Sequence, residues 1–296
     1  MPNLNDVLAA VQHQLHRAGI DSPAAEAAIL VSHVLETTRG RLGVMRALGE
    51  DISDDAAVRI EQLVNARATR IPLQHLTGET TFYGVDLNVE PGVFIPRVET
   101  EILVETTLQH FAEGSGELKI LDLCTGSGAI AAALADQFAQ RDRPTRIWAV
   151  ELDPAAVSLA QNNTRPYNVS VLCADATDTT SIIAADPTLA DRLGTFDAVV
   201  TNPPYIPVST PVTQPEAVQD PQLALYGGSL DGLAVPAQIA EVAADWLAAD
   251  GFFMMEHDHT HATEIAGVLA SDPKWHHVET INDLTGTQRF VSAVRA

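Results

Sequence analysis

The sequence predicts an α/β protein in which a small all-helical domain and a β-hairpin precede a seven-stranded, mostly parallel sheet. Apolar residues recur at helical spacing from residue 4 to about residue 70. From about residue 97 onwards, five short apolar segments alternate with helical segments, as in a doubly wound parallel sheet. The last two apolar segments are separated only by "DLTGTQ", a connection that suits an antiparallel hairpin.

The first domain, to which we assign residues 1–75, is predicted from three helical stretches. The first stretch ends at Gly19, a residue type that commonly terminates helices. The second opens with Ser22-Pro23, an N-cap followed by proline at the first helical position. The third opens with a cap at Ser53 and has acidic residues in its first turn.

The hairpin linker is assigned to residues 76–96. The segment "FYGVDLNVEPGVFIP" alternates apolar and polar side chains, and the turn residues Glu90, Pro91 and Gly92 interrupt the alternation. We therefore expect the chain to reverse around these three residues.

The α/β domain is assigned to residues 97–296. In a doubly wound sheet the fourth strand lies beside the first, at the point where the strand order reverses, and ligands bind there. The predicted strands are 119–124, 146–152, 169–175, 196–202, 251–257, 276–282 and 289–295.

The composition indicates a globular protein with a sizeable core, because 46% of the 296 residues are hydrophobic. The N-terminus lacks a signal pattern and no run of 18 apolar residues occurs, so we expect a cytoplasmic protein without a membrane partner. Cys124 and Cys173 are placed at the ends of the first and third predicted strands. The second strand should lie between them, which predicts free thiols.

The negative charge is concentrated in the second part of the chain. The formal net charge is −22, and residues 1–75 contribute nine acidic and seven basic side chains to it. The remaining residues hold 30 acidic and 10 basic side chains. Because phosphate binding needs lysine and arginine, no direct nucleic-acid partner is expected.

A glycine-rich turn follows the first predicted strand, in "ILDLCTGSGAIAAALA". Gly126 and Gly128 would let the backbone approach a ligand at the start of the next helix, beside Thr125 and Ser127. The pattern is weak by itself, because Ala131 stands where a dinucleotide fingerprint usually has a third glycine.

Carboxylates follow the next two predicted strands. Glu151 could accept hydrogen bonds from two ribose hydroxyls, and Asp175 could accept one from an adenine amino group. Acidic side chains disfavour a pyrophosphate but suit S-adenosylmethionine, whose sulfonium is a cation. We therefore expect S-adenosylmethionine as the cofactor.

The fourth predicted strand ends in "NPPY". Two prolines cannot continue a sheet, so they fix the backbone and aim carbonyl oxygens at the ligand edge. Asn202, the Pro203 carbonyl and the flat face of Tyr205 would together fit a planar –NH2 group. Two acceptors would hold its N–H bonds and turn the nitrogen lone pair toward the methyl donor.

"NPPY" after an apolar strand resembles methyltransferases that act on planar amino or amide nitrogens. Three further segments resemble one group among them, the release-factor glutamine methyltransferases of the PrmC/HemK family. These segments are "RIPLQHLTGETTFYGVDLNVEPGVFIPRVETEILVE", "QDPQLALYGGSLDGL" and "LTGTQRFVSAVRA". The resemblance implies a Rossmann-like seven-stranded methyltransferase domain and peptide-chain release factors as protein substrates.

The resemblance also implies roles for particular residues. The substrate would be the glutamine side-chain amide in the Gly-Gly-Gln loop of the release factor. Asn202 and Pro203 would bind that amide, and Pro204 and Tyr205 would line its pocket. Arg97, Glu99 and Glu101 fall on a "RPETE"-like segment beside the active site. The implied cofactor-binding residues are Thr125, Gly126, Ser127, Gly128, Glu151, Asp175, Ala176 and Asn202.

Some positions depart from the family pattern, and other functions remain open. Cys124 stands where the family usually has glycine, Glu151 where aspartate is commoner, and Val98 where proline is usual. A nucleic-acid adenine methyltransferase would share "NPPY", and an NAD-linked oxidoreductase or a non-catalytic adenosine-binding module would share the glycine-rich turn. The histidines of "HDHTH", residues 257–261, are expected to be ordinary loop residues without a metal.

Overall fold

The computed structural model describes residues 1–211 and 213–296. The chain divides into two compact units, which we describe separately. Unit 1 comprises Met1–Glu79 together with Thr213–Gln219, and unit 2 comprises Thr80–Val212 together with Asp220–Ala296. Among the described residues, no helix is both long enough and apolar enough to cross a membrane.

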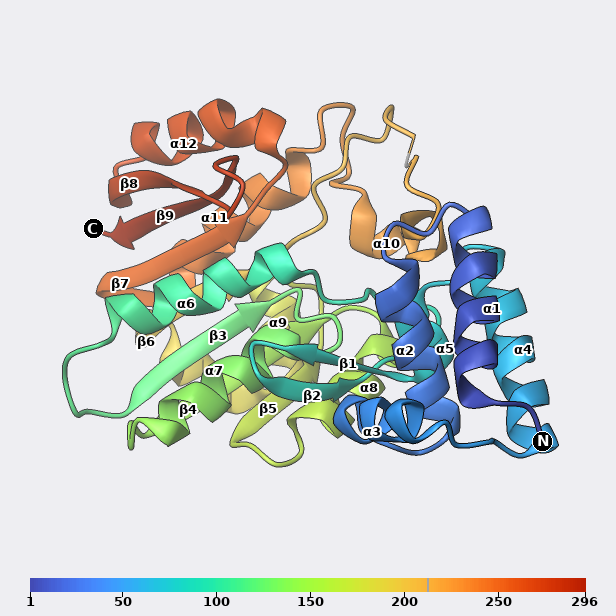
Figure 1. Ribbon diagram of the computed structural model, residues 1–296. Coiled ribbons are helices and arrows are strands. Elements are labelled where there is room, and N and C mark those ends of the chain that lie inside the picture. The colour runs from blue at the N-terminus through green and yellow to red at the C-terminus, as the bar shows by residue number, and fades with distance from the viewer. Residues whose placement is uncertain (212) are drawn as a thin grey trace. The chain divides into compact units, whose positions relative to one another are not determined.

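Unit 1 is built from helices (Figure 1). Ser53 caps α4 by accepting a hydrogen bond from the Ala56 N–H, as predicted. Pro23 occupies the first turn of α2, but the Ser22 side chain makes no capping bond. Two short helices, α3 and α5, have no counterpart among the predicted stretches. The bounds are α1 Leu4–Arg17, α2 Pro23–Val34, α3 Arg39–Leu48, α4 Asp54–Ala68 and α5 Leu73–Thr77.

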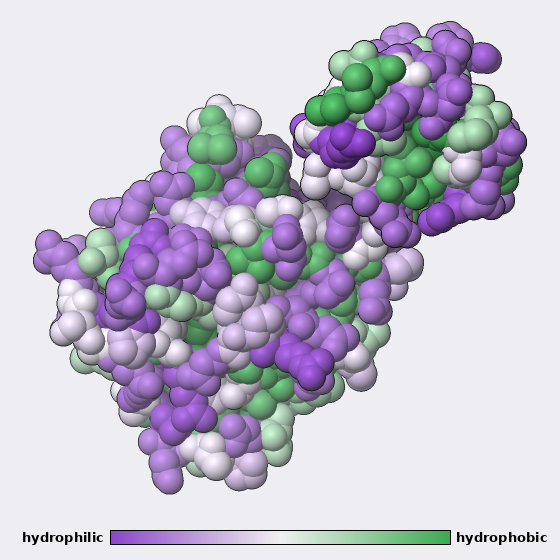
Figure 2. All heavy atoms as spheres, turned by 60° about the horizontal axis from the view of Figure 1, so that its bottom comes forward, coloured by the Kyte–Doolittle hydropathy of each residue, from purple (hydrophilic) through white to green (hydrophobic). Residues whose placement is uncertain are grey.

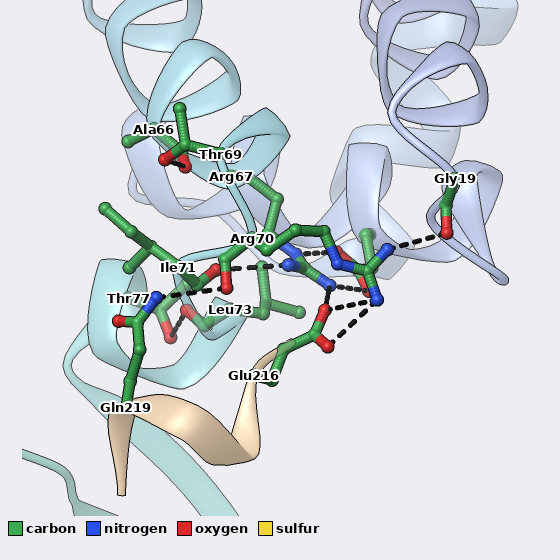
Figure 3. A network of polar contacts seen from close by, with 11 residues as sticks. Gly19, Ala66, Arg67, Thr69, Arg70, Ile71, Leu73, Thr77, Glu216 and Gln219 are labelled. Atoms are coloured by element: carbon green, nitrogen blue, oxygen red, sulfur yellow. Dashed lines mark hydrogen bonds and ion pairs between the residues drawn. The ribbon is translucent and has the colours of Figure 1, made fainter. Parts of the chain in front are cut away.

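A distant segment of the chain, residues 213–219, is joined to unit 1 by charge pairs (Figure 3). The Glu216 carboxylate lies 3.0 Å from Arg67 and 2.9 Å from Arg70. Arg67 also pairs with Glu26 at 2.6 Å, and its side chain is only 6% exposed. Gln219 donates to the Arg70 carbonyl. Since buried guanidinium groups need partners, Glu216 helps to hold this segment in unit 1.

Unit 2 contains a seven-stranded sheet of order β5-β4-β3-β6-β7-β9-β8. β9 pairs antiparallel with β7 and β8, and the other pairs are parallel. The predicted fold is therefore confirmed, including the fourth α/β strand, β6, beside the first, β3. Cys124 and Cys173 are free and lie on either side of β4. The bounds are β3 Leu118–Leu123, β4 Thr145–Glu151, β5 Val169–Cys173, β6 Phe196–Thr201, β7 Leu247–Glu256, β8 Trp275–Asn282 and β9 Gln288–Arg295.

Helices cover both faces of the sheet (Figure 1). One face packs on α6 (Glu101–His110) and α7 (Ala129–Gln140), with α8 (Pro154–Thr164) beside α7. The other face packs on α9 (Thr179–Ala185), α11 (Ala234–Trp246) and α12 (Ala262–Ser271).

The visible surface in Figure 2 is largely polar, and its hydrophobic atoms form separate patches. Shorter elements are α10 Gln222–Leu225 and the 3-10 helices Val98–Thr100, Pro187–Arg192, Ala217–Gln219 and His259–His261.

The predicted hairpin exists, but its turn was placed wrongly. β1 (Glu79–Phe82) and β2 (Val85–Asn88) are joined by Tyr83 and Gly84, not by the residues around Pro91. Tyr83 and Gly84 have φ angles of 47° and 82°, as in a type I′ turn. The Tyr83 N–H donates to the Glu101 carboxylate at 2.8 Å, which offsets the strain of a positive φ at an aromatic residue.

Candidate active site

A cavity of about 290 Å³ lies at the carboxyl ends of the central strands of unit 2. This is the edge at which doubly wound sheets bind ligands. The lining residues include most of the predicted site residues, namely Thr125, Gly126, Ser127, Glu151, Asp175, Ala176, Asn202, Pro203, Pro204 and Tyr205. Thus, segments at the ends of four strands, β3, β4, β5 and β6, bring the residues predicted for cofactor and acceptor into one cavity.

The glycine-rich turn after β3 forms one wall of this cavity. Cys124, Gly126 and Gly128 all have positive φ angles, of 60°, 57° and 81°. A side chain at Gly126 would meet no protein atom within 4 Å, whereas a Cβ at Gly128 would press on Ala160 of α8. Gly126 therefore lets the backbone approach a ligand, and Gly128 permits close packing of helices. Burial raises the pKa of the Cys124 thiol, which stays protonated.

The Glu151 carboxylate is held at the mouth of the turn by backbone N–H groups. Oε2 accepts from Gly126 at 2.9 Å, and Oε1 accepts from Leu152 and Asp153 at 2.8 and 3.0 Å. A carboxylate oxygen has two lone pairs, so Oε2, which accepts only one N–H, can still accept from a ligand hydroxyl, whereas both lone pairs of Oε1 are occupied. The carboxylate is thus fixed in place before a ligand binds.

Asp175, after β5, is oriented in a similar way. Its Oδ1 accepts from the backbone N–H and the hydroxyl of Thr177, at 2.9 and 2.6 Å. Its backbone N–H donates to the Ser181 hydroxyl at 3.0 Å. These bonds fix the Asp175 side chain in the wall of the cavity, where it can accept a hydrogen bond from an amino group.

We predict that Glu151→Ala weakens cofactor binding by about tenfold or more, because it removes the charged acceptor for a ligand hydroxyl. Isothermal titration with S-adenosylmethionine measures the effect. Asp178→Ala is the matched control, because Asp178 caps α9 and is not among the residues that line the cavity. An unchanged dissociation constant in Glu151→Ala would count against this role.

One functional candidate, Asp122, was missed by the sequence interpretation. It lies in β3, is fully buried, and its Oδ2 accepts from the Thr125 hydroxyl at 2.5 Å. Burial raises its pKa to about 7. An acidic residue inside the apolar run "ILDLC" was the available signal. Asp122 orients Thr125, and therefore the start of the glycine-rich turn.

Asp122 should make stability depend on pH. The folded state binds this proton more tightly than the unfolded chain, in which the carboxyl ionises near 3.8. Its stabilising contribution is therefore complete below about pH 4 and is lost as the pH rises through about 7. Urea unfolding should show that the free energy of unfolding of wild type falls by a few kcal/mol relative to that of Asp122→Asn between about pH 4 and pH 7. A difference that stays constant with pH would contradict the prediction.

The "NPPY" segment forms the opposite wall. Asn202 directly follows β6, and its Nδ2 lies 3.3 Å from the Thr100 hydroxyl oxygen. The Tyr205 hydroxyl donates to the buried Glu256 carboxylate at 3.0 Å. Burial, together with the adjacent carboxylate, raises the pKa of Tyr205, so the phenol stays neutral. Burial also raises the pKa of Glu256, against the opposing effect of its two hydroxyl donors and Arg289.

The "YGGSLDGL" segment supports this wall from behind. The Ile206 N–H donates to the Leu225 carbonyl at 2.8 Å, and the Gly227 N–H donates to the Ile206 carbonyl at 3.0 Å. A Cβ at Gly232 would lie 2.3 Å from the Tyr205 carbonyl oxygen. Glycine at position 232 is therefore required for the loop after β6 to keep its course.

Four predicted site residues, Arg97, Glu99, Glu101 and Gly128, lie outside the lining of the cavity. Gly128 forms the N-cap of α7. The Arg97 guanidinium pairs with the buried Asp220 and lies over the ring of Phe94, which does line the cavity. The Glu101 carboxylate accepts a hydrogen bond from the Tyr83 N–H in the hairpin turn. Contact of Arg97 or Glu101 with a substrate stays a prediction.

The histidines of "HDHTH" differ in their exposure to solvent. His257 and His261 are buried, whereas the His259 side chain is 54% exposed. Within residues 1–211 and 213–296, no group of three or more histidine, cysteine, aspartate or glutamate side chains could hold a metal ion.

Comparisons with known proteins establish the family to which this chain belongs. A PrmC N-terminal domain matches residues 6–78, and a methyltransferase small domain matches residues 84–218. The release factor glutamine methyltransferase of Mycolicibacterium smegmatis is 40% identical over 295 residues, covering 100% of this chain and 99% of the relative. This chain belongs to the release factor glutamine methyltransferase family.

Other members of the family are similarly close over their whole length. The release factor glutamine methyltransferase of Deinococcus radiodurans is 36% identical, with 99% of each chain covered. A solved methyltransferase structure from Pyrococcus furiosus is 20% identical, with a TM-score of 0.49, and covers 72% of this chain and 89% of that one. The identity over whole chains, rather than this structural likeness, establishes the family.

Proposed function

We propose that this protein transfers a methyl group from S-adenosylmethionine to the glutamine side-chain amide nitrogen in the Gly-Gly-Gln loop of peptide-chain release factors. The observation that carries the proposal is the juxtaposition of Asn202–Tyr205 with Gly126, Glu151 and Asp175 in one cavity. The family relatives of the same name support it.

The residues of the cavity fit S-adenosylmethionine. Gly126 leaves space beside the backbone, and Glu151 and Asp175 offer acceptors suited to ribose hydroxyls and an adenine amino group. Their negative charge suits a cationic ligand and disfavours a pyrophosphate. Bound there, S-adenosylmethionine supplies an electrophilic methyl group on its sulfonium sulfur.

The enzyme's own residues contribute mainly by positioning. An amide nitrogen is a poor nucleophile, because its lone pair is delocalised into the carbonyl. Asn202 Oδ1 and the Pro203 carbonyl accept its two N–H bonds and direct the lone pair toward the methyl carbon. Such alignment can contribute about 7–11 kcal/mol. The proton becomes acidic only after transfer, so water can remove it and no strong base is required.

A protein substrate is favoured over nucleic acid by charge. Unit 2 holds most of the chain's excess of acidic side chains, which would repel phosphates. We further propose that the near-neutral helical domain docks the release factor. The cavity by itself recognises one amide, so selection of one protein among many requires a second contact.

Transfer of a labelled methyl group tests both proposals. Incorporation into the Gly-Gly-Gln glutamine of an intact release factor, and not into duplex DNA, is expected. A short Gly-Gly-Gln peptide should have a much lower kcat/KM, because it lacks the remote contact. Labelled adenine with an unlabelled factor would overturn the function, whereas equal kcat/KM for peptide and factor would overturn only the docking role.

A further inference from the structure

The Glu256 carboxylate joins two segments of the cavity wall. Glu256 ends β7 and is 3% exposed. Its Oε1 accepts from the Tyr205 hydroxyl at 3.0 Å, and its Oε2 accepts from the Thr100 hydroxyl at 2.6 Å. Thr100 precedes α6, so residues more than 100 positions apart meet at this carboxylate. Glu256 itself is not among the residues that line the cavity.

The hydrogen bond to Glu256 determines whether the Thr100 hydroxyl acts as a donor or an acceptor toward a second partner. A hydroxyl has one proton and two lone pairs. Because the proton of Thr100 is donated to a carboxylate, its oxygen can only accept from any further partner. That partner is the Asn202 amide, whose Nδ2 lies 3.3 Å away.

We propose that Thr100 and Glu256 are positioning residues that set the orientation of the Asn202 amide. The NH2 group is held toward Thr100, which directs Oδ1 toward the acceptor amide. Rotated by 180°, the Asn202 side chain would set Oδ1 against the Thr100 oxygen with no proton between them. This inference rests on the proposed role of Asn202 as acceptor of the substrate N–H.

The same carboxylate restrains the second acceptor-site residue. Its bond to Tyr205 fixes the loop three residues after Asn202. A glutamine at position 256 could accept from only one of the two hydroxyls, because its other group is a donor. The freed Thr100 proton could then turn toward Asn202 and favour the wrong amide orientation.

Five full-length variants test the proposal: Thr100→Val, Thr100→Ser, Glu256→Gln, Thr107→Val and the double variant Thr100→Val/Glu256→Gln. Thr107→Val is the matched control, because Thr107 lies in α6, the helix that follows Thr100, is fully buried, and its hydroxyl donates to the Leu103 carbonyl. Methylation of an intact release factor gives kcat and KM, and titration gives the cofactor dissociation constant. Thermal unfolding measures the stability lost in each variant.

Thr100→Val and Glu256→Gln are expected to lower kcat by about 10- to 100-fold, with cofactor affinity changed less than about threefold. Thr100→Ser should restore kcat to within about threefold of wild type, and Thr107→Val should match wild type despite lost stability. The double variant Thr100→Val/Glu256→Gln should be no slower than the slower single variant, because both act on one amide.

Two results would overturn the inference. The first is a kcat of Thr100→Val equal to that of Thr107→Val. The second is a double variant in which the fold-reduction of kcat equals the product of the reductions in the two single variants. Failure of the proposed function is distinguishable, because in that case wild type itself would not label the factor.

Discussion

Asn202→Ala is expected to reduce methyl transfer by about 1,000-fold while leaving cofactor affinity within a few-fold of wild type. The substitution removes the acceptor oxygen at the end of β6 but no group assigned to the ribose or adenine. Steady-state transfer to an intact release factor and titration with S-adenosylmethionine give the two quantities.

The matched control for this change is Asn168→Ala. Asn168 is an exposed asparagine just before β5, at the opposite end of the strands from the cavity, and it bonds the Thr145 carbonyl. Its replacement should leave both quantities unaltered. Transfer by Asn202→Ala within a few-fold of wild type, with cofactor bound normally, would exclude Asn202 as the amide clamp.

Gly232→Ala is expected to lower kcat/KM by about 100-fold, although residue 232 lies 30 positions from Asn202 in sequence. The new Cβ would lie 2.3 Å from the Tyr205 carbonyl oxygen and 2.8 Å from the Pro207 nitrogen. Backbone atoms cannot yield as a flexible side chain can, so the loop after β6 must shift. A displacement of about 1 Å at a reacting group can cost about 100-fold in rate.

Gly228→Ala separates this clash from backbone strain. Gly228 and Gly232 have nearly equal φ angles, 78° and 77°, so both variants bear the strain of alanine in the left-handed region. At Gly228, however, the nearest atom is Val235 Cγ2 at an ordinary 3.4 Å. Gly228→Ala should therefore keep kcat/KM within about threefold of wild type. Equal losses in the two variants would show that strain, rather than displacement of Tyr205, is responsible.

Local sequence patterns were sufficient to predict the seven strands of the large sheet. The alternation of apolar strands with helices predicted the first five strands of the sheet, the short connection "DLTGTQ" predicted the last two as a hairpin, and the parallel topology placed β6 beside β3. The glycine-rich turn, Glu151, Asp175 and "NPPY" each follow a strand, so their meeting at one edge follows from that order. Ser53 capped its helix as expected because capping involves residues only three positions apart.

Features that depend on distant residues could not be predicted in this way. The hairpin turns at Tyr83 because Glu101, 18 residues later, accepts its N–H, whereas the sequence offered a more typical turn around Pro91. Residues 213–219 belong to unit 1 because Glu216 pairs with Arg67 and Arg70, about 150 positions away. Both involve pairings between residues far apart in the chain, which leave no periodic signal in the sequence.

The sequence by itself determined which residues reach the ligand edge, because strand ends and turn residues are encoded by neighbouring positions. Only the tertiary structure decided how those residues are held. Asp122 and Glu256 read as isolated acids in apolar strands, and their burial against Thr125, Thr100 and Tyr205 arises when separate segments pack together. A buried carboxylate must find hydrogen-bond donors, and the fold, rather than local propensity, determines which donors are within reach.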